Sequence, residues 1–332
     1  MAWLTVLFAL GCAARRFDYL VTESAPLGYP IEVVRGWVFD ADGSVITYVP
    51  GSTRGLGWGE MGSRHIVGAR RKPVPTSLDV LWFAFAEDRF YRVAGPLPHE
   101  EMLRMFREGT PDPNAPGERL PYDAIVVGMA PGGDVGVWMH SRRVVRRVAT
   151  LRGAPVDVPW TAVLDNPDVA RSDYVQSVVQ RTRAELSGRG LPREPVWRDD
   201  PLPAARWGMD AARVVWTPTV AEGGVVDSLW VHTLDGEVEW IDFTGRADAP
   251  RAPVDRALPN AFDLLWTTPR GEAVRTEVDL DDRDVRAAFE GVVGSVTVDI
   301  VPCDAGDHVT VHVIRPDGTR TVVPREVRVW AR

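Results

Sequence analysis

The run LDVLWFAFA, residues 78–86, carries large apolar side chains on both faces of a predicted strand. Its apolar residues are Leu78, Val80 and Trp82 on one side and Leu81, Phe83 and Phe85 on the other. Apolar residues on both faces are typical of a strand that is covered on both sides. The beginning of this run, LDVLW, recurs as FDLLW at residues 262–266. The run therefore predicts a buried strand and a second copy of it.

Further pairs of motifs recur in the same order along the chain. Asp-Gly follows a Trp-Val strand in both places, and Asp-Gly between apolar runs predicts a β-hairpin. The separation between the members of a pair decreases along the chain, as expected for two copies of one unit of which the second has shorter loops. The pairs are Trp37-Val38 and Trp230-Val231, Asp42-Gly43 and Asp235-Gly236, residues 97–106 and 280–289, and Gly133-Asp134 and Gly306-Asp307.

Three helices are predicted between the strands. Pro98 favours a helix start and Gly109 a helix end, and an apolar stripe between them predicts a helix over residues 98–108. Acidic residues at 281, 282 and 284 would begin the matching helix of the second copy, because aspartate side chains cap free backbone amides. A third amphipathic helix, residues 172–187, connects the two copies, and Gly188 ends it.

The predicted fold class is α+β, with two tandem β-rich units that each form a mainly antiparallel sheet or sandwich with one helix. The length of 332 residues agrees with about two domains. The predicted segments are a signal peptide at residues 1–12, the first unit with its connecting helix at 28–187, a proline-containing linker at 188–205, and a second, degenerate copy at 206–332.

The first residues of the chain are typical of an export signal. The run MAWLTVLFALG is too short to span a bilayer, which needs about 20 residues, and suits the apolar core of a signal peptide. The residues ALGC that end at Cys12 are similar to the bacterial lipobox, although no Lys or Arg precedes them and Ala9 stands where Leu is usual. We expect Cys12 to be lipidated and to anchor the chain on the periplasmic face of the envelope, at the outer membrane, without a transmembrane helix after processing. The alternative is a buried N-terminal strand.

Charge and cysteine content exclude several classes of protein. The formal net charge is −8, and the two cysteines are Cys12 and Cys303. A negative net charge argues against nucleic acid as the main partner, because the phosphate backbone requires a basic surface. Two cysteines are too few for a disulfide framework or a cysteine zinc cluster.

Four motifs match functional patterns, and each has a simpler structural interpretation. Residues 57–62, GWGEMG, match a dinucleotide-binding pattern, but a strand and not a helix is expected after them, which indicates a surface loop. His308 and His312 fall on a predicted strand, where four residues span about 13 Å and one zinc ion cannot reach both. The carboxylates at 279–284 lack the glycine and glutamate of a calcium loop, and the Glu87-Asp88 pair is expected at a hairpin tip. We predict no catalytic residue, no metal site and no cofactor.

Several motifs of the first copy point to one family. They are Pro75, LDVLWF at 78–83, Glu87, Phe90-Tyr91, Leu97-Pro98, Phe106, Tyr122-Asp123 and PGGDVGVW at 131–138. Together they resemble a family of bacterial lipoproteins whose domain has no assigned function. The likeness covers residues 28–150 and implies an envelope lipoprotein, without any catalytic residue. Some related envelope lipoproteins resemble immunity partners of toxins that contact-dependent systems secrete.

The resulting hypothesis is a non-enzymatic envelope lipoprotein that binds a protein partner and acts as an immunity protein against a secreted toxin of a type VI-like system. The expected contact surface combines the loop at residues 51–72 with the hairpin tip at 87–89, because Trp58 of that loop has no counterpart in the second copy. The expected contact residues are Trp58, Glu60, Arg64, Glu87, Asp88 and Arg89. Two alternatives remain open: a glycan-binding module, and a hydrolase whose site is assembled from distant residues.

Overall fold

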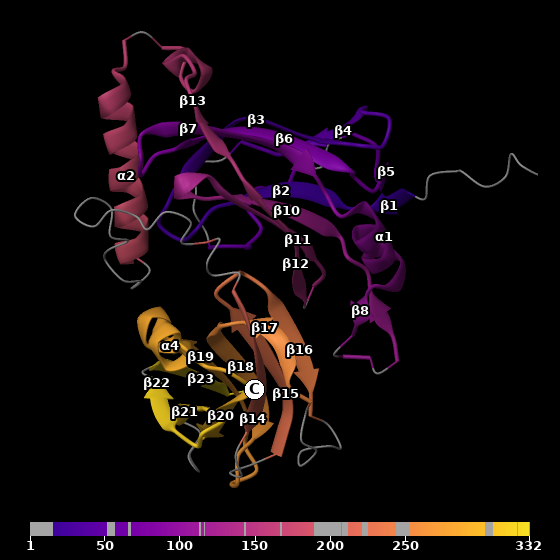
Figure 1. Cartoon of the computed structure of the whole chain (residues 1–332), viewed down its shortest axis with the longest axis vertical. Helices are drawn as coiled ribbons and strands as arrows, with labels where there is room; N and C mark the ends of the chain where they lie inside the picture. Colours follow the sequence, from indigo (N-terminus) through magenta and orange to yellow (C-terminus); the bar gives the residue numbers. More distant parts are fainter. Residues whose placement is uncertain are drawn as a thin grey trace, which may run out of the picture.

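The fold is mostly β, with 52% of the residues in strands and 16% in helices (Figure 1). The computed structural model describes residues 16–51, 57–65, 68–112, 114–115, 117–142, 144–166, 168–188, 207, 212–220, 225–243, 252–302, 308–323 and 325–331. We refer to residues 16–188 as the first half and to residues 212–331 as the second half. No helix in the described segments is long and apolar enough to cross a membrane.

The first half contains a five-stranded antiparallel sheet whose centre is the apolar run of residues 78–86. Trp82 on this central strand is fully buried and stacks on Tyr91 of the neighbouring strand. The strand order is β13 (Ala154–Val156), β7 (Arg89–Pro96), β6 (Ser77–Ala84), β3 (Ile31–Phe39) and β4 (Val45–Tyr48). The prediction of a strand covered on both sides is confirmed, since one face packs in the main core and the other against a helix.

A nine-stranded sheet runs through both halves. Its two parts join where β12 pairs with β16 through Val145 and Val238. β2 and β10 pair in parallel, and the other neighbours are antiparallel. The order is β2 (Leu20–Ser24), β10 (Ala124–Met129), β11 (Asp134–His140), β12 (Val145–Arg152), β16 (Val238–Asp242), β15 (Val225–Thr233), β18 (Pro259–Thr267), β19 (Ala273–Leu280) and β23 (Arg325–Ala331).

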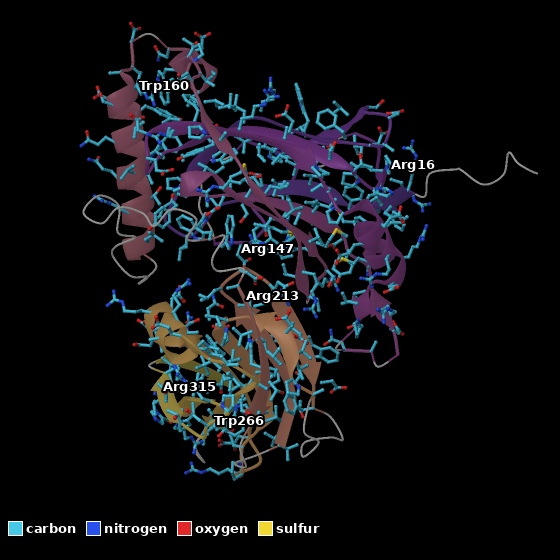
Figure 2. The ribbon with its side chains drawn as sticks, in the orientation of Figure 1. Arg16, Arg147, Trp160, Arg213, Trp266 and Arg315 are labelled. Atoms are coloured by element: carbon cyan, nitrogen blue, oxygen red, sulfur yellow. The ribbon has the colours of Figure 1, made fainter. Side chains whose placement is uncertain are left out.

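The second half adds a five-stranded sheet that packs on β15, β18 and β19. Its order is β17 (Val254–Ala257), β14 (Arg213–Val220), β20 (Val296–Pro302), β21 (Val309–Ile314) and β22 (Arg320–Val323). The order β4-β3-β6-β7-β13 of the first half corresponds to β16-β15-β18-β19-β23 of the second. Trp82 of β6 and Trp266 of β18 are both fully buried at matching places in these orders. Figure 2 shows Trp266 within the second half.

Three α-helices have described bounds, α1 (His99–Glu108), α2 (Arg171–Gly188) and α4 (Asp282–Phe289). All three fall where the sequence predicts a helix. Asp281 caps α4 by accepting hydrogen bonds from the amides of Arg283 and Asp284 at 2.9 and 3.1 Å. The valines of α2 pack on aromatic residues of the β6–β7 hairpin; this cluster contains Phe83, Phe85, Phe90, Val175, Val178 and Val179.

Short elements complete the described chain. They are β1 (Arg16–Asp18), β5 (Arg71–Pro73), β8 (Thr110–Pro111), β9 (Arg119–Leu120) and the 3₁₀ turns η1 (Pro131–Gly133) and η2 (Trp160–Ala162). β1 pairs with β5 and β2 with β10, so residues before the predicted start of the first unit at 28 belong to its sheets. The predicted signal peptide and, apart from residue 188 at the end of α2, the predicted linker lie outside the described residues.

The predicted α+β class with two tandem units of one helix each is wrong. The chain is mostly β, and α2 packs on the first half, which therefore carries two described helices, α1 and α2. The two halves also share the nine-stranded sheet and are not separate sheet units. The physical reason is that the aromatic residues of β6 and β7 bury the apolar face of α2, while β12 and β16 meet at one paired position and so connect the sheets of the two halves.

Candidate functional site

The loop at residues 57–65 covers an edge of the nine-stranded sheet. It runs antiparallel along β2, with a bridge between Ala25 and Gly57 and a hydrogen bond of 2.9 Å from the Gly62 amide to the Glu23 carbonyl. The carboxylate of Glu23, 1% exposed, also accepts a hydrogen bond of 2.8 Å from the Ser63 amide. An edge strand needs such cover, because its free backbone groups would otherwise pair with another chain. The GWGEMG motif lies in a loop and opens no helix, as the sequence predicts, whereas residues 61–65 do not form the strand expected after it.

Trp58 in this loop packs between the two halves of the chain. Its ring meets that of Trp138 edge to face, with centroids 4.9 Å apart. The guanidinium of Arg147 lies over both rings, at 5.9 Å from Trp58 and 5.4 Å from Trp138. The predicted contact residue Trp58 is thus engaged with its own chain, and much of its ring is not available to a partner.

The Asp235-Gly236 turn between β15 and β16 docks on these tryptophans. Trp138 Nε1 donates a hydrogen bond of 2.9 Å to the carbonyl of Asp235. A Cβ atom placed on Gly236 would lie 2.5 Å from the Trp58 carbonyl oxygen, so the two backbones touch. The equivalent turn of the first half, with Gly43, has nothing within 4 Å of such a position.

Two buried carboxylates complete the contact between the halves. Glu237 accepts hydrogen bonds from the Arg147 amide at 3.0 Å and from Arg213 Nη1 at 3.1 Å. Asp235 is 1% exposed, and its Oδ2 lies 3.8 Å from Arg213 Nη1. Burial raises the pKa of Asp235, and the charge of Glu237 raises it further. The side chains of Arg147 and Arg213 are seen where the two halves meet (Figure 2).

His140 on β11 holds the loop from the sheet side. Its Nε2 donates a hydrogen bond of 2.7 Å to the carbonyl of Gly59. Burial lowers the pKa of His140 to about 4, so the ring is neutral at neutral pH. Because a neutral imidazole has one N–H, this bond fixes the proton on Nε2.

The β6–β7 hairpin tip is held by α2 and by the turn before β11. The Glu87 carboxylate accepts a hydrogen bond of 2.7 Å from the Gly132 amide. Asp88 has a φ of 51°, a left-handed conformation that aspartate tolerates better than most residues. Arg171 binds it twice, from Nε to the carboxylate at 2.8 Å and from Nη2 to the carbonyl at 2.7 Å. Arg89 projects from the tip as an exposed residue.

The structure brings the loop and the hairpin tip together. Trp58 and Ala86, next to the tip, both pack on a cluster of Tyr29, Ala130 and Trp207. Leu27, two residues before Tyr29 in the turn between β2 and β3, is 38% exposed, and sequence reasoning missed it. An apolar residue within the Pro26–Gly28 turn was its only signal. We call the surface formed by Leu27, Trp58, Glu60, Glu87, Asp88 and Arg89 the loop–tip surface.

Arg64 is not part of the loop–tip surface. It lies at the other end of the loop, where its charge acts on Asp123 at the start of β10. Burial raises the pKa of Asp123, and Arg64 partly opposes that rise. Of the predicted contact residues, Trp58 is thus joined to the tip through a shared cluster, whereas Arg64 acts on Asp123 and the charge of Glu60 acts on His232 of β15.

The described residues contain no group of three or more His, Cys, Asp or Glu side chains that could hold a metal ion. His312 lies on β21 as predicted, and His308 precedes the strand and contacts Arg325 Nη2 at 2.7 Å. Burial is the main cause that lowers the pKa of His312. Cys303 lies outside the described residues.

Comparison with known proteins gives a family and no function. Residues 11–193 match the family described as "Protein of unknown function (DUF2931)". No curated protein and no solved structure matches the chain. The matched segment includes the loop–tip surface, the residues around Cys12 and the first half of the fold. Because the match spans more than half of the chain, the chain belongs to the DUF2931 family, whose function is unknown.

Proposed function

We propose that this chain is a non-enzymatic, lipid-anchored envelope protein that binds a protein partner through the loop–tip surface. In this proposal Cys12 carries the lipid and holds the chain on the periplasmic face of the outer membrane. The partner is a secreted toxin, and the chain neutralises it by occupying the surface that the toxin needs. The lipobox-like sequence before Cys12 supports the anchor.

The observation that carries the proposal is the composition of the loop–tip surface. Leu27 is 38% exposed two residues before Tyr29, on whose cluster the loop and the tip both pack, and the loop and the tip carry exposed residues of both charges, Glu60, Asp88 and Arg89. Protein interfaces commonly combine an apolar centre with a charged and polar rim. Such a surface favours a protein partner with complementary charges over a small apolar ligand.

The loop–tip surface is also held in place before any partner binds. β2 fixes the loop through backbone hydrogen bonds, while Arg171 and Gly132 fix the tip. A preorganised surface loses less conformational entropy on association, which favours tight binding. This rigidity suits a protein that must capture a toxin at low concentration.

The test is affinity capture from the native host, followed by mass spectrometry. The test variant is Glu60→Arg combined with Arg89→Glu, which leaves the net charge unchanged. The matched control is Arg270→Glu combined with Glu272→Arg at the β18–β19 turn, the corresponding hairpin of the second half. We expect the wild type and the control to retain the same secreted protein and the test variant to lose it. Equal retention by both variants would rule out the loop–tip surface.

The anchor is tested separately by fractionation of host cells. We expect the wild-type chain in the membrane fraction and Cys12→Ser in the soluble periplasmic fraction. An unchanged distribution of the Cys12→Ser chain would contradict lipid anchoring and leave the partner test unaffected.

A further inference from the structure

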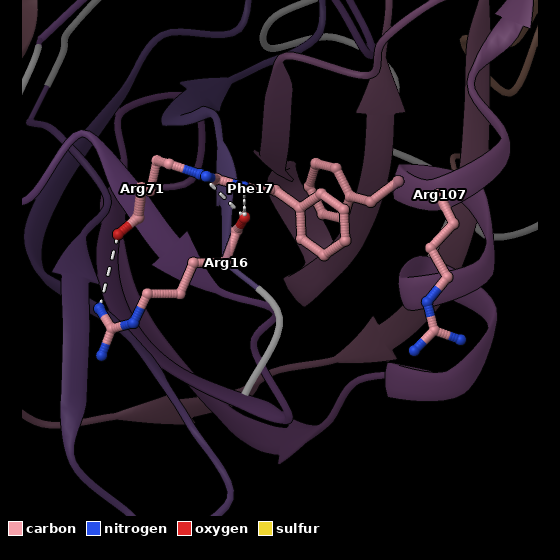
Figure 3. Close-up of a pocket in the computed structure, with 5 residues that line it drawn as sticks. Arg16, Phe17, Arg71 and Arg107 are labelled. Atoms are coloured by element: carbon pink, nitrogen blue, oxygen red, sulfur yellow. Dashed lines mark hydrogen bonds between the residues drawn. The ribbon is translucent and has the colours of Figure 1, made fainter. Parts of the chain in front are cut away.

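An open pocket lies where β1, β5 and α1 meet, on the side of the first half away from α2 (Figures 1 and 3). It has a volume of about 340 Å³ and is lined by Arg16, Phe17, Arg71, Phe106 and Arg107. The rings of Phe17 and Phe106 stack with centroids 5.0 Å apart. Figure 3 shows Phe17 near its centre, with Arg16 and Arg71 on one side and Arg107 on the other.

The pocket is positively charged. No carboxylate lines it, and the acidic residues next to the lining residues in sequence, Asp18 and Glu108, are paired with other arginines. Asp18 of β1 binds Arg70 at 2.6 Å, and Glu108 of α1 binds Arg104 at 3.1 Å. Asp18 also stands opposite Arg71 in the register of β1 and β5, but among the described residues the three pocket arginines form no ion pair, on a chain whose net charge is −8. An anion is the ligand that this arrangement favours.

The backbone positions two of the guanidinium groups. Arg71 donates from Nε and Nη2 to the carbonyl of Arg16 at 3.1 and 2.8 Å. Arg16 Nη1 in turn approaches the carbonyl of Arg71 at 3.5 Å. These contacts orient the side chains without neutralising them. Guanidinium groups match the geometry of phosphate oxygens, so phosphate is the anion that suits this pocket best.

The sequence places the pocket close to the proposed lipid anchor. Cys12 precedes Arg16 by four residues, and four extended residues reach at most about 14 Å. A chain anchored at Cys12 would therefore hold Arg16 within that distance of its lipidated residue. Arginines at a membrane surface are attracted to anionic headgroups.

We propose that this pocket binds the phosphate of an anionic phospholipid in the membrane that anchors the chain. The inference rests on the proposed anchoring at Cys12. The anionic headgroup would lie against these guanidinium groups, which Figure 3 shows on two sides of the Phe17 ring, with the phenyl rings beside the glycerol of the lipid. Such a contact would fix the orientation of the chain and leave the loop–tip surface on the other side, near α2, accessible to a partner.

The test uses the mature chain from residue 12 with Cys12→Ser, so that no covalent lipid contributes to binding. Flotation is measured with vesicles of phosphatidylethanolamine and phosphatidylglycerol, and with vesicles of phosphatidylcholine alone. The pocket variant changes Arg16, Arg71 and Arg107 to Gln. The matched control changes three exposed arginines elsewhere to Gln and so removes the same charge; these are Arg181, Arg270 and Arg283.

We expect the chain to float with the anionic vesicles only. The pocket variant should bind about 100-fold more weakly, at about fivefold per arginine, and Arg107→Gln alone about fivefold more weakly. The control variant should bind within about twofold of the parent chain, because its arginines do not line the pocket.

Other outcomes overturn the inference. Equal losses in the pocket and control variants would show unspecific charge attraction. Thermal stabilisation by inorganic phosphate that needs the three arginines, without vesicle binding, would assign the pocket to a soluble phosphate instead. Failure of the proposed anchoring is distinguished from either result, because it appears in cell fractionation of the wild-type chain and not in this assay.

Discussion

Trp138 Nε1 donates a hydrogen bond of 2.9 Å to the backbone carbonyl of Asp235, across the boundary between the two halves of the chain. Trp138 is fully buried, and its ring also packs on Trp58. This bond and the single paired position between β12 and β16 link the halves at one place. The loop that forms part of the proposed partner surface therefore depends on the second half for its own position.

Trp138→Phe tests this link. The change removes the only indole donor to the Asp235 carbonyl and leaves a buried acceptor unsatisfied, which should cost about 1–3 kcal/mol of unfolding free energy. The matched control is Trp37→Phe on β3, a residue that is 37% exposed, and its cost should stay below about 1 kcal/mol. Urea unfolding of the two variants measures the difference. Equal losses would mean that the Trp138 bond adds nothing to stability.

The two Asp-Gly turns offer a second comparison. Gly236 has a φ of +82° and touches the Trp58 backbone. Gly43 has a φ of +84°, and no other residue lies within 4 Å of the position that its Cβ atom would take. Alanine at either position carries the penalty of a left-handed conformation, about 1–2 kcal/mol. Gly236→Ala must also displace the Trp58 carbonyl and should cost at least about 1 kcal/mol more than Gly43→Ala. Thermal unfolding of both variants would reveal this, and the prediction fails if their melting temperatures fall equally.

His140 predicts a pH dependence of stability. Its pKa is about 4 in the folded chain and about 6.5 when unfolded, so the unfolded chain binds more protons between these values. Stability therefore rises with pH through this window and is lost as the pH falls from about 6.5 to about 4, by about 3 kcal/mol from this residue. His140→Gln keeps an N–H near the Gly59 carbonyl and does not titrate. Between pH 6.5 and pH 4, the unfolding free energy of His140→Gln should therefore fall by about 3 kcal/mol less than that of the wild type.

Other groups do not disturb this comparison. Burial lowers the pKa of His232 and raises that of Asp235, and both residues remain in His140→Gln. Their contributions are therefore shared by the two proteins and cancel in the difference. Parallel curves of stability against pH for the two proteins would contradict the assignment to His140.

Local structure was the most predictable part of this chain. Trp82 and Trp266 recur in matching motifs, and both lie fully buried on strands at matching places in the sheet order. The three described helices fall where the apolar stripes and capping residues predict them. These elements can be predicted from sequence because a strand or helix with one buried face carries apolar side chains at a fixed spacing along the chain.

Contacts between segments that are distant in sequence could not be predicted from the sequence. Asp42-Gly43 and Asp235-Gly236 are the same dipeptide, yet only the second turn docks on Trp58. The pairing of Val145 with Val238 joins strands that are far apart in sequence. No residue pattern within either strand predicts which strand it pairs with. For the same reason Trp58, an isolated tryptophan in a loop, predicts a partner contact although its ring packs inside the chain. The predicted fold class failed at this level, where the pairing of whole strands and the packing of α2 decide the architecture.

The hairpin tip gives the last prediction. Arg171 holds Asp88 by two hydrogen bonds while its guanidinium lies 5.2 Å from the centre of the Phe83 ring. Arg171→Lys keeps the charge but loses the two-pronged geometry and the stacking, so the tip should become more mobile. We expect faster hydrogen exchange of the amides at residues 87–89, weaker partner capture, and a loss of about 1 kcal/mol in unfolding free energy. Arg181→Lys, at an exposed position on the same helix, should change none of these. Unchanged exchange at the tip in Arg171→Lys would show that Arg171 does not hold the tip.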